Sequence, residues 1–299
     1  MGAQHERRRA APRRELHPCG GSAAASFAAS VGAQHDCHQP SQGAVMTVID
    51  TRLPALLRGS RPVLGIFIGV PSPALVEMAG HAGFDFVIID NEHGPASLET
   101  TEHMLRAAHL SGIVPVVRTL ETDILRVLDI GASGIQVPAV NTAEQARRVV
   151  AAAKYPPVGT RGAAFSTRAA GYGFFGGAPH VTASNDGIAV IVMAETRQAI
   201  DNLDEIIKVP GIDAVFFGPN DLSFSMGHPG EMRHPEVVAA IEDGVRRTLA
   251  AGIAPGVLAA NPQEFHHWAK RGARYLPMVI TGLVGSALKG AVAGCREAR

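Results

Sequence analysis

The sequence predicts an α/β protein of the (β/α)8 TIM-barrel class. Short runs rich in valine and isoleucine recur along the chain without polar alternation, which is typical of strands buried on both faces of a parallel sheet. Most of these runs follow a glycine, and a glycine in the left-handed conformation commonly ends a helix before the next strand begins. Residues 46–299 also have about the length of such a barrel, roughly 250 residues.

Eight apolar runs give eight expected strands. In chain order they are Val63–Ile68, Phe84–Ile89, Ile113–Arg118, Ile135–Val140, Ile188–Ala194, Ile212–Phe217, Ile253–Leu258 and Ala273–Ile280. The stretch Ala143–Lys154 is an amphipathic helix between two of them, preceded by the cap-type residues Asn141 and Thr142. A doubly wound open sheet is the alternative. It usually has a glycine-rich phosphate loop after an early strand, which this sequence lacks, so the barrel is favoured.

The segment Tyr155–Gly177 is a long irregular stretch between the fourth and fifth expected strands. Loops of this length in compact domains are usually functional or disordered. Its aromatic residues and two arginines, Arg161 and Arg168, favour an ordered lid or a subunit contact.

The first 45 residues differ in composition from the rest of the chain. They are rich in arginine, alanine, serine and glycine and have no apolar periodicity, so they cannot bury enough surface to fold. Met46 then begins a stretch that looks like an ordinary protein start. We therefore expect residues 1–45 to be a disordered or mis-annotated extension, with an organellar presequence as the alternative, and residues 46–299 to form the barrel.

The overall composition narrows the class of protein. The formal net charge is zero and 46% of the residues are hydrophobic, which argues against nucleic-acid partners and against a role at a membrane surface. No apolar stretch reaches the roughly 18 residues of a transmembrane helix. The three cysteines, Cys19, Cys37 and Cys295, are far apart and odd in number. This pattern favours a reduced, cytoplasmic setting over a disulfide framework.

Carboxylates follow the fifth and sixth expected strands, as Glu195 and Asp221. The carboxyl ends of barrel strands meet at one mouth, so we expect these two side chains to lie close together. They offer hard oxygen ligands of the kind that Mg²⁺ or Mn²⁺ binds together with water and substrate. The alternative is that each carboxylate caps the helix that follows it, and Asp221 does resemble an N-cap residue.

A histidine, His93, follows Asp90 and Glu92 after the second expected strand. Histidine titrates near neutral pH and can act as a general base. A carboxylate beside the ring would orient it, and Asp90 is the local candidate, with Asp129 as another possible neighbour. The alternative is a structural histidine in a strand-end turn.

An arginine, Arg118, ends the third expected strand. It can bind a carboxylate in bidentate fashion or stabilise a developing oxyanion, and the alternative is a salt bridge to a strand-end acid. Residues 218–221 lead into a helix start, where backbone N–H groups can hold a substrate carboxylate.

Together these groups suit enolate chemistry on a 2-oxo acid. Such a substrate can chelate a metal through its carboxylate and keto oxygens, and the metal then stabilises the enolate. The base moves the proton that accompanies carbon–carbon cleavage. Lys154, Lys208, Lys270 and Lys289 fall in helical or loop segments, so a metal-dependent aldolase is favoured over a Schiff-base aldolase.

Four separate motifs resemble the HpcH/HpaI aldolase family. They are Asp90–Gly94, Lys154–Gly162, Ala194–Arg197 and Gly218–Ser223. The resemblance covers nearly all of residues 46–299. It implies a class II, metal-dependent pyruvate aldolase on a (β/α)8 barrel. It also implies a homo-oligomer, a hexamer built as a trimer of dimers, with the C-terminal helix exchanged between subunits.

The resemblance implies a role for each site residue. Glu195 and Asp221 would bind a divalent metal, Mg²⁺, Mn²⁺ or Co²⁺, and His93 would be the general base. Arg118 would bind the keto oxygen and stabilise the enolate. The backbone amides of Asn220 and Asp221 would hold the pyruvate carboxylate. Asp129 matches the family acid that raises the basicity of the histidine, although the segment between Arg118 and Asp129 looks about three residues shorter than in the family.

The expected function is therefore reversible aldol cleavage of a 4-hydroxy-2-oxo acid to pyruvate and an aldehyde. The alternatives are a CoA-ester lyase of the malyl-CoA or citrate-lyase type, and a non-catalytic barrel subunit. Met193 stands where some family members have a glutamine that touches substrate, so a polar contact is expected to be missing.

Overall fold

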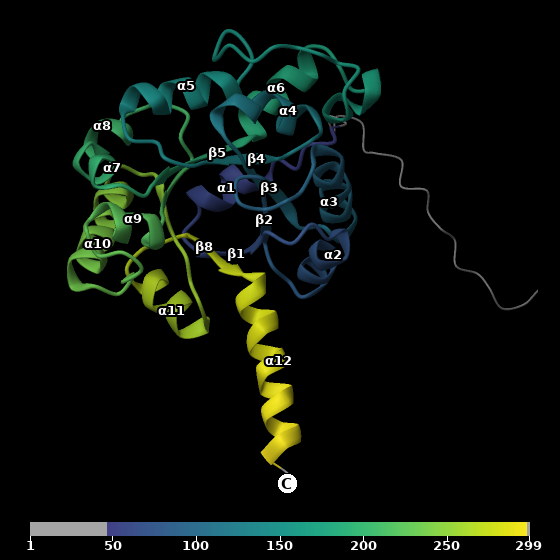
Figure 1. Cartoon of the computed structure of the whole chain (residues 1–299). Coiled ribbons are helices and arrows are strands. Elements are labelled where there is room, and N and C mark those ends of the chain that lie inside the picture. Colours follow the sequence, from purple (N-terminus) through teal and green to yellow (C-terminus); the bar gives the residue numbers. More distant parts are fainter. Residues whose placement is uncertain (1–46, 298–299) are drawn as a thin grey trace, which may run out of the picture. The chain divides into compact units, whose positions relative to one another are not determined.

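Eight parallel strands close into a barrel in chain order, which confirms the predicted fold class (Figure 1). The fold is seen in a computed structural model, which describes residues 47–297. The expected extension, residues 1–45, lies outside the described residues. The strands are β1 (Val63–Ile68), β2 (Phe86–Asp90), β3 (Val114–Arg118), β4 (Gly134–Val137), β5 (Ala189–Ala194), β6 (Ala214–Phe217), β7 (Ala254–Val257) and β8 (Tyr275–Val279).

The strand bounds differ from the expected ones mainly in β4. We expected this strand to reach Val140, but it ends at Val137. Pro138 has no N–H to donate to the ladder, and Ala139 has a left-handed φ of 54°. This turn aims the Ala139 N–H at Glu195 Oε1, at 2.7 Å, so the early end of β4 helps to build the site.

Helices surround the barrel and connect its strands. They are α1 (Arg52–Arg58), α2 (Pro73–His81), α3 (Leu98–Ser111), α4 (Ile124–Asp129), α5 (Ala143–Ala153), α6 (Ala178–Gly187), α7 (Arg197–Asp201), α8 (Leu203–Ile206), α9 (Pro219–Ser225), α10 (Pro235–Ala250), α11 (Pro262–Lys270) and α12 (Ile280–Glu297), with short 3₁₀ helices η1 (Glu121–Asp123) and η2 (Arg168–Gly173). The expected cap of α5 is confirmed, because Thr142 forms a capping box with Gln145. Within residues 47–297, no helix is both long and apolar enough to cross a membrane.

The segment between α5 and α6 packs on α4 through its two arginines. The Arg161 side chain is fully buried and lies 2.8 Å from the Asp129 carboxylate. Arg168 Nη1 donates to the backbone oxygen of Ile130 at 2.8 Å. The segment is thus tied to the barrel wall, and its role as a lid or a subunit contact stays a prediction.

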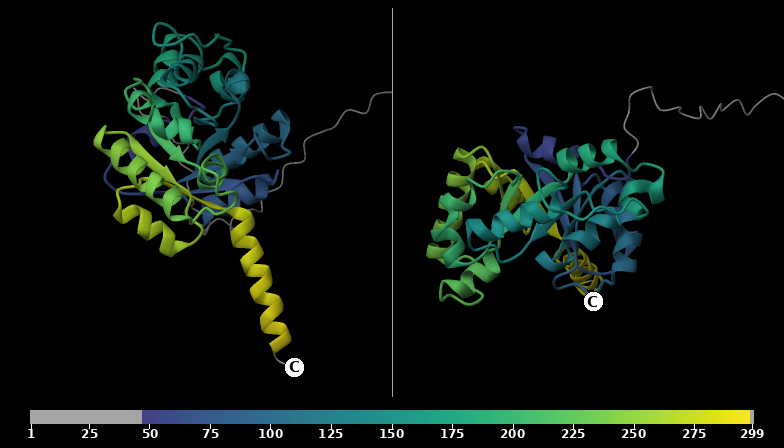
Figure 2. Two further views of the ribbon diagram at one scale, coloured as in Figure 1. Left: turned by 60° about the vertical axis from the view of Figure 1, so that its left-hand side comes forward. Right: turned by 90° about the horizontal axis from the view of Figure 1, so that it is seen from above.

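The last helix, α12, extends away from the barrel (Figures 1 and 2). Its apolar side chains Val284, Leu288 and Val292 are exposed, in contrast to the buried faces of α3, α5 and α10. This face has no partner among the described residues of the chain.

The barrel interior is filled by side chains, as in other barrels of this size. Phe86 and Tyr275 stack with their ring centroids 4.3 Å apart, and the Tyr275 hydroxyl donates to Gln136 at 2.9 Å. Gly65 faces this stack, and a Cβ there would lie 2.0 Å from the ring of Phe86. The absence of a side chain at Gly65 therefore allows the aromatic pair to fill the barrel.

We predict that Gly65→Ala destabilises the barrel, because the added methyl group overlaps the Phe86 ring. Overpacking of this kind costs about 1–3 kcal/mol in the free energy of unfolding, which urea denaturation followed by circular dichroism measures. Gly162→Ala is the control, since the nearest atom to its added Cβ is 4.0 Å away. Equal stability of the two variants would contradict the close packing of Gly65.

Candidate active site

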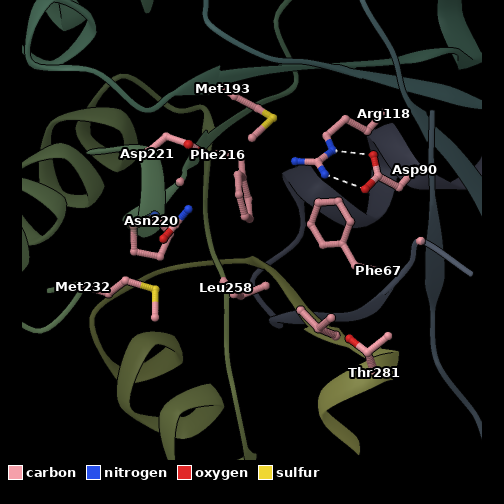
Figure 3. A pocket seen from close by; sticks show the side chains of 14 residues that line it. Phe67, Asp90, Arg118, Met193, Phe216, Asn220, Asp221, Met232, Leu258 and Thr281 are labelled. Atoms are coloured by element: carbon pink, nitrogen blue, oxygen red, sulfur yellow. Dashed lines mark hydrogen bonds and ion pairs between the residues drawn. The ribbon is translucent and has the colours of Figure 1, made fainter. Parts of the chain in front are cut away.

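A cavity of about 280 Å³ opens at the carboxyl ends of the strands (Figure 3). Its lining comes from at least six strand ends, as expected for the functional face of a barrel. Its polar residues include Asp90, Arg118, Asn220 and Asp221. The remaining lining is largely apolar and consists of Phe67, Met193, Phe216, Pro219, Met232, Leu258 and Val279, with Gly69, Gly218 and Thr281.

Asp90 and Arg118 form the central ion pair of the cavity. They stand directly opposite each other in the β2–β3 register. Arg118 Nε donates to Asp90 Oδ1 at 2.8 Å and Nη2 donates to Oδ2 at 2.6 Å, which is the bidentate geometry that arginine favours. Arg118 Nη1 also lies 3.2 Å from Glu92 Oε2, and the guanidinium carbon is 5.0 Å from the centroid of the Phe67 ring.

The pair is ionised at neutral pH. Burial alone would raise the pKa of Asp90, but the hydrogen bonds and charge of Arg118 outweigh burial and hold this pKa below its ordinary value. Burial would likewise lower the pKa of Arg118, and its carboxylate neighbours raise it instead. The salt bridge that we gave as the alternative for Arg118 is therefore present, and it holds the guanidinium at the cavity wall.

Glu195 directly follows β5 and is almost completely buried. Its Oε1 accepts the Ala139 N–H, whereas its Oε2 has no hydrogen-bond partner among the described residues. Desolvation raises the pKa of Glu195 to about 7, and the negative charges of Asp221 and Glu92 contribute. Gly218 permits this placement, because a Cβ there would lie 2.8 Å from Oε2.

Asp221 lies in the first turn of α9 and lines the cavity. The alternative that it caps this helix is wrong, because the N-cap residue is Gly218 and no side chain caps the helix. Glu195 and Asp221 therefore place two carboxylates beside one cavity, and one buried oxygen of Glu195 lacks a partner. Such a set of hard oxygen donors fits a divalent cation, which would offset the charges that burial leaves uncompensated.

His93 lies in the turn after β2, and 69% of its side chain is exposed. Its backbone N–H and that of Glu92 donate to Asp90 Oδ1 at 3.3 and 3.1 Å. Gly94 keeps the turn tight, since a Cβ there would lie 2.2 Å from the Asp90 backbone oxygen.

Among residues 47–297, no hydrogen bond or ion pair joins the Asp90 carboxylate to the His93 imidazole, and the role of Asp90 beside the ring stays a prediction. Both oxygens of Asp90 are engaged by Arg118, and one also accepts the two backbone amides of the turn. The carboxylate near the ring is that of Glu92, whose Oε1 is 3.8 Å from His93 Nε2. Asp90 therefore positions the turn and Arg118, while Glu92 faces the histidine.

Asp129 ends α4, where its carboxylate pairs with Arg161. Among residues 47–297, no hydrogen bond or ion pair joins Asp129 to His93, and Asp129 does not line the cavity. The arginine that binds Asp129 lies in the long segment before α6. The pairing of Arg161 with Asp129 could not be predicted from the sequence, although Arg161 belongs to one of the four motifs. The proposed effect of Asp129 on the histidine stays a prediction.

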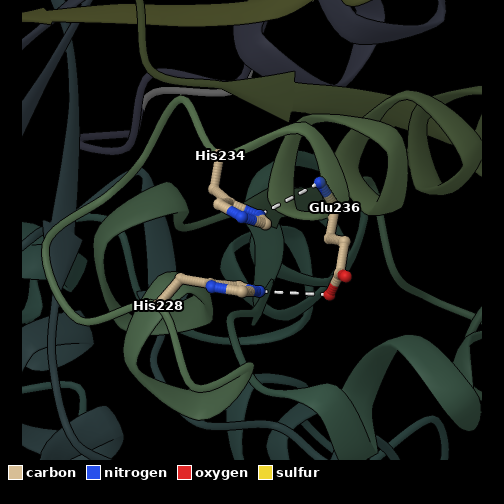
Figure 4. A group of neighbouring side chains, drawn as sticks. All are labelled: His228, His234 and Glu236. Carbon is tan, nitrogen blue, oxygen red and sulfur yellow. Dashed lines mark hydrogen bonds and ion pairs between the residues drawn. The ribbon is translucent and has the colours of Figure 1, made fainter.

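A second group of potential ligands lies outside the cavity (Figure 4). His228, His234 and Glu236 bring one ligand atom each within 4.8 Å of one another. The two imidazole rings stack with centroids 3.4 Å apart, and His228 Nε2 lies 3.1 Å from Glu236 Oε2. His234 Nδ1 accepts the Glu236 backbone N–H at 3.3 Å and so caps the start of α10, which leaves this nitrogen engaged. We interpret these three residues, called the clasp below, as contacts that hold together the two ends of the loop between α9 and α10.

Sequence comparison identifies the family. A profile of the HpcH/HpaI aldolase/citrate lyase family matches residues 63–283, which include every strand of the barrel and the residues around the cavity. The chain belongs to this family. The expected resemblance is thus confirmed.

Individual family members agree with this assignment. A 2-keto-3-deoxy-L-rhamnonate aldolase of Klebsiella pneumoniae is 40% identical over 229 residues, which are 75% of this chain and 85% of that protein. A 4-hydroxy-2-oxo-heptane-1,7-dioate aldolase of the same organism is 41% identical over 228 residues, with the same coverage. The crystal structure of an HpcH/HpaI family protein from Burkholderia cenocepacia is 30% identical, covers 82% of this chain and 99% of its own, and superposes with a TM-score of 0.79.

We predict that Asp90→Asn destabilises this family member. The substitution leaves the positive charge of Arg118 poorly compensated. We expect the free energy of unfolding to fall by up to about 3 kcal/mol. This is the low end of the range for a buried ion pair, because both side chains are still partly exposed. Urea denaturation measures the effect. Glu205→Gln, which breaks the exposed pair of Glu205 with Lys208, is the control and leaves the midpoint unchanged. If both variants unfold at the same urea concentration, the pair is not a structural constraint.

Proposed function

We propose that the protein catalyses reversible aldol cleavage of a 4-hydroxy-2-oxo acid to pyruvate and an aldehyde. The observation that most strongly supports this proposal is the pair of carboxylates, Glu195 and Asp221, near Arg118, which is held at the wall of the cavity at the strand ends. The expected enzyme class, a carbon–carbon lyase of the aldolase type, is confirmed by relatives about 40% identical that are named aldolases.

We assign Glu195 and Asp221 as the residues that hold a divalent metal, with Mg²⁺, Mn²⁺ and Co²⁺ as candidates. The metal would polarise the keto group of the substrate and stabilise the enolate charge. The unpartnered Oε2 of Glu195 and the mutual repulsion of the carboxylates support this assignment.

Arg118 binds the keto oxygen in this proposal. Asp90, Glu92 and the Phe67 ring fix the guanidinium before substrate arrives, so little reorganisation is needed as negative charge develops on that oxygen. The backbone amides of Asn220 and Asp221, in the uncapped first turn of α9, hold the substrate carboxylate.

His93 moves the proton. In the cleavage direction its imidazole accepts the proton of the C4 hydroxyl as the C3–C4 bond breaks and the aldehyde leaves. The electron pair of that bond passes into the enolate, and protonation at C3 then forms the methyl group of pyruvate. The turn fixed by Asp90 and the nearby Glu92 carboxylate support this role.

The alternatives receive less support. A CoA-ester lyase needs basic groups for a large anionic cofactor, whereas Arg118 is the single basic residue in the described cavity lining and is already paired. A non-catalytic barrel would be expected to lose some of the site groups, and all of them are present.

We infer a homo-oligomer, a hexamer as a trimer of dimers, in which α12 packs on another subunit. The exposed apolar residues of this projecting helix support the inference, and sedimentation of a monomer at micromolar concentration would overturn it. The neutral charge and scattered cysteines favour a cytoplasmic location.

Metal removal tests the central assignment. We expect proton–deuterium exchange at the methyl group of pyruvate, followed by NMR, to fall about 100-fold or more in EDTA and to recover with Mg²⁺, Mn²⁺ or Co²⁺. We expect Glu195→Gln to prevent the recovery of exchange when metal is added back. Glu205→Gln, at an exposed position of α8, is the control and should not prevent it. Exchange that persists in EDTA would rule out the metal mechanism.

Replacement of His93 by alanine tests the base. We expect the same exchange reaction to slow by about 10²–10⁴, the usual contribution of a general base. His81→Ala changes an exposed histidine at the end of α2 and serves as the control. Exchange at the unmodified rate in the His93 variant would remove His93 from the mechanism.

A further inference from the structure

A second cavity of about 520 Å³ lies beside the active-site cavity and is not used by the proposed mechanism. Its inner wall is apolar and combines Val238 and Ile241 of α10, Val257 of β7 and Trp268 of α11. Its charged or titratable lining residues are Arg233, Glu264 and His267, and the first two pair with each other.

The two cavities share a wall. Pro219, Met232 and Leu258 line both of them. Of these, Met232 lies in the loop between α9 and α10, and it is 45% exposed. Methionine is unbranched and flexible, so this side chain can adopt more than one rotamer at the shared wall. The clasp of His228, His234 and Glu236 holds the ends of the loop and leaves Met232 between them.

The charges around the active-site cavity disfavour an anionic electrophile. Arg118 is the one cation in its described lining and is occupied by Asp90 and Glu92. The described lining therefore has no further cation to pair with a second carboxylate, phosphate or sulfonate. At the rim of the second cavity, Arg233 is 84% exposed and pairs with Glu264 at 2.6 Å, so it offers no free positive charge.

We propose that the second cavity is a subsite for the tail of the electrophile, and that this electrophile is an uncharged aldehyde with an apolar chain. The aldehyde carbon lies in the active-site cavity near the enolate. The chain passes Met232 and Leu258 and packs against the apolar wall formed by α10 and α11. The inference rests on the proposed aldolase function and names its substrate class.

The first test compares aldehydes in the addition of pyruvate by the full chain loaded with Mg²⁺. We expect kcat/KM to rise about three- to fourfold per methylene from propanal to hexanal, the gain for burying one methylene group. Succinic semialdehyde, which is butanal with its terminal methyl group replaced by a carboxylate, is expected to react at least tenfold less well than butanal. A flat chain-length series, or a preference for the anionic aldehyde, would overturn the proposal.

The second test fills the subsite with Val238→Trp. We expect the ratio of kcat/KM for hexanal to that for propanal to fall at least tenfold, with each rate normalised to pyruvate methyl exchange. Leu110→Trp adds the same bulk at an exposed position of α3 and should leave the ratio unchanged. An unchanged ratio in the Val238 variant would place the tail elsewhere.

Methyl exchange requires no aldehyde, so it separates the two hypotheses. Absence of exchange contradicts the aldolase function itself. Exchange without chain-length dependence contradicts only the tail subsite.

Discussion

The ion pair between Asp90 and Arg118 is the constraint on which the rest of the site depends. The strand register places the two residues opposite each other, and the bidentate geometry then leaves one orientation for the guanidinium. The same carboxylate accepts the amides of the turn that carries His93. One side chain thus holds both the cation that faces the substrate and the backbone of the proposed base. Because both partners stand on strands, their positions are set by the barrel rather than by a loop.

Beside Asp221, the constraint is a buried carboxyl group without enough hydrogen-bond partners. Glu195 receives one backbone N–H, from a left-handed Ala139, and fits against Gly218 because Gly218 has no side chain. The negative charge of Asp221 acts on the same carboxyl group. Each of these details brings negative charge together in a poorly solvated place, which is unfavourable in itself. In the proposed function, a divalent cation held by these carboxylates would offset this cost.

The barrel and most residues at its mouth could be predicted from the sequence, because the signals for them lie within single short segments of the chain. Buried parallel strands are continuous apolar runs, and a polar residue at the end of such a run belongs to the mouth of the barrel. The end of β4 at Val137 was missed because an apolar run does not reveal a backbone turn. The pairing of Asp129 with Arg161 and the second cavity were missed because they join segments far apart in the chain. Glu92 faces His93 in place of Asp90 because Arg118 occupies Asp90, a competition that only three-dimensional contacts reveal.

The loop between α9 and α10 separates the residues that contact the electrophile in our proposal from the residues that perform the enolate chemistry. The polar groups of the site stand on β2 and β3, directly after β2 and β5, or in the first turn of α9, whereas Met232 lies in a loop that is held by contacts of its own. Loops tolerate changes of sequence and length that strands in a closed barrel do not. During divergence from a common ancestor, the sequence of this loop can therefore change to accept other aldehydes, while the residues of the enolate chemistry stay the same.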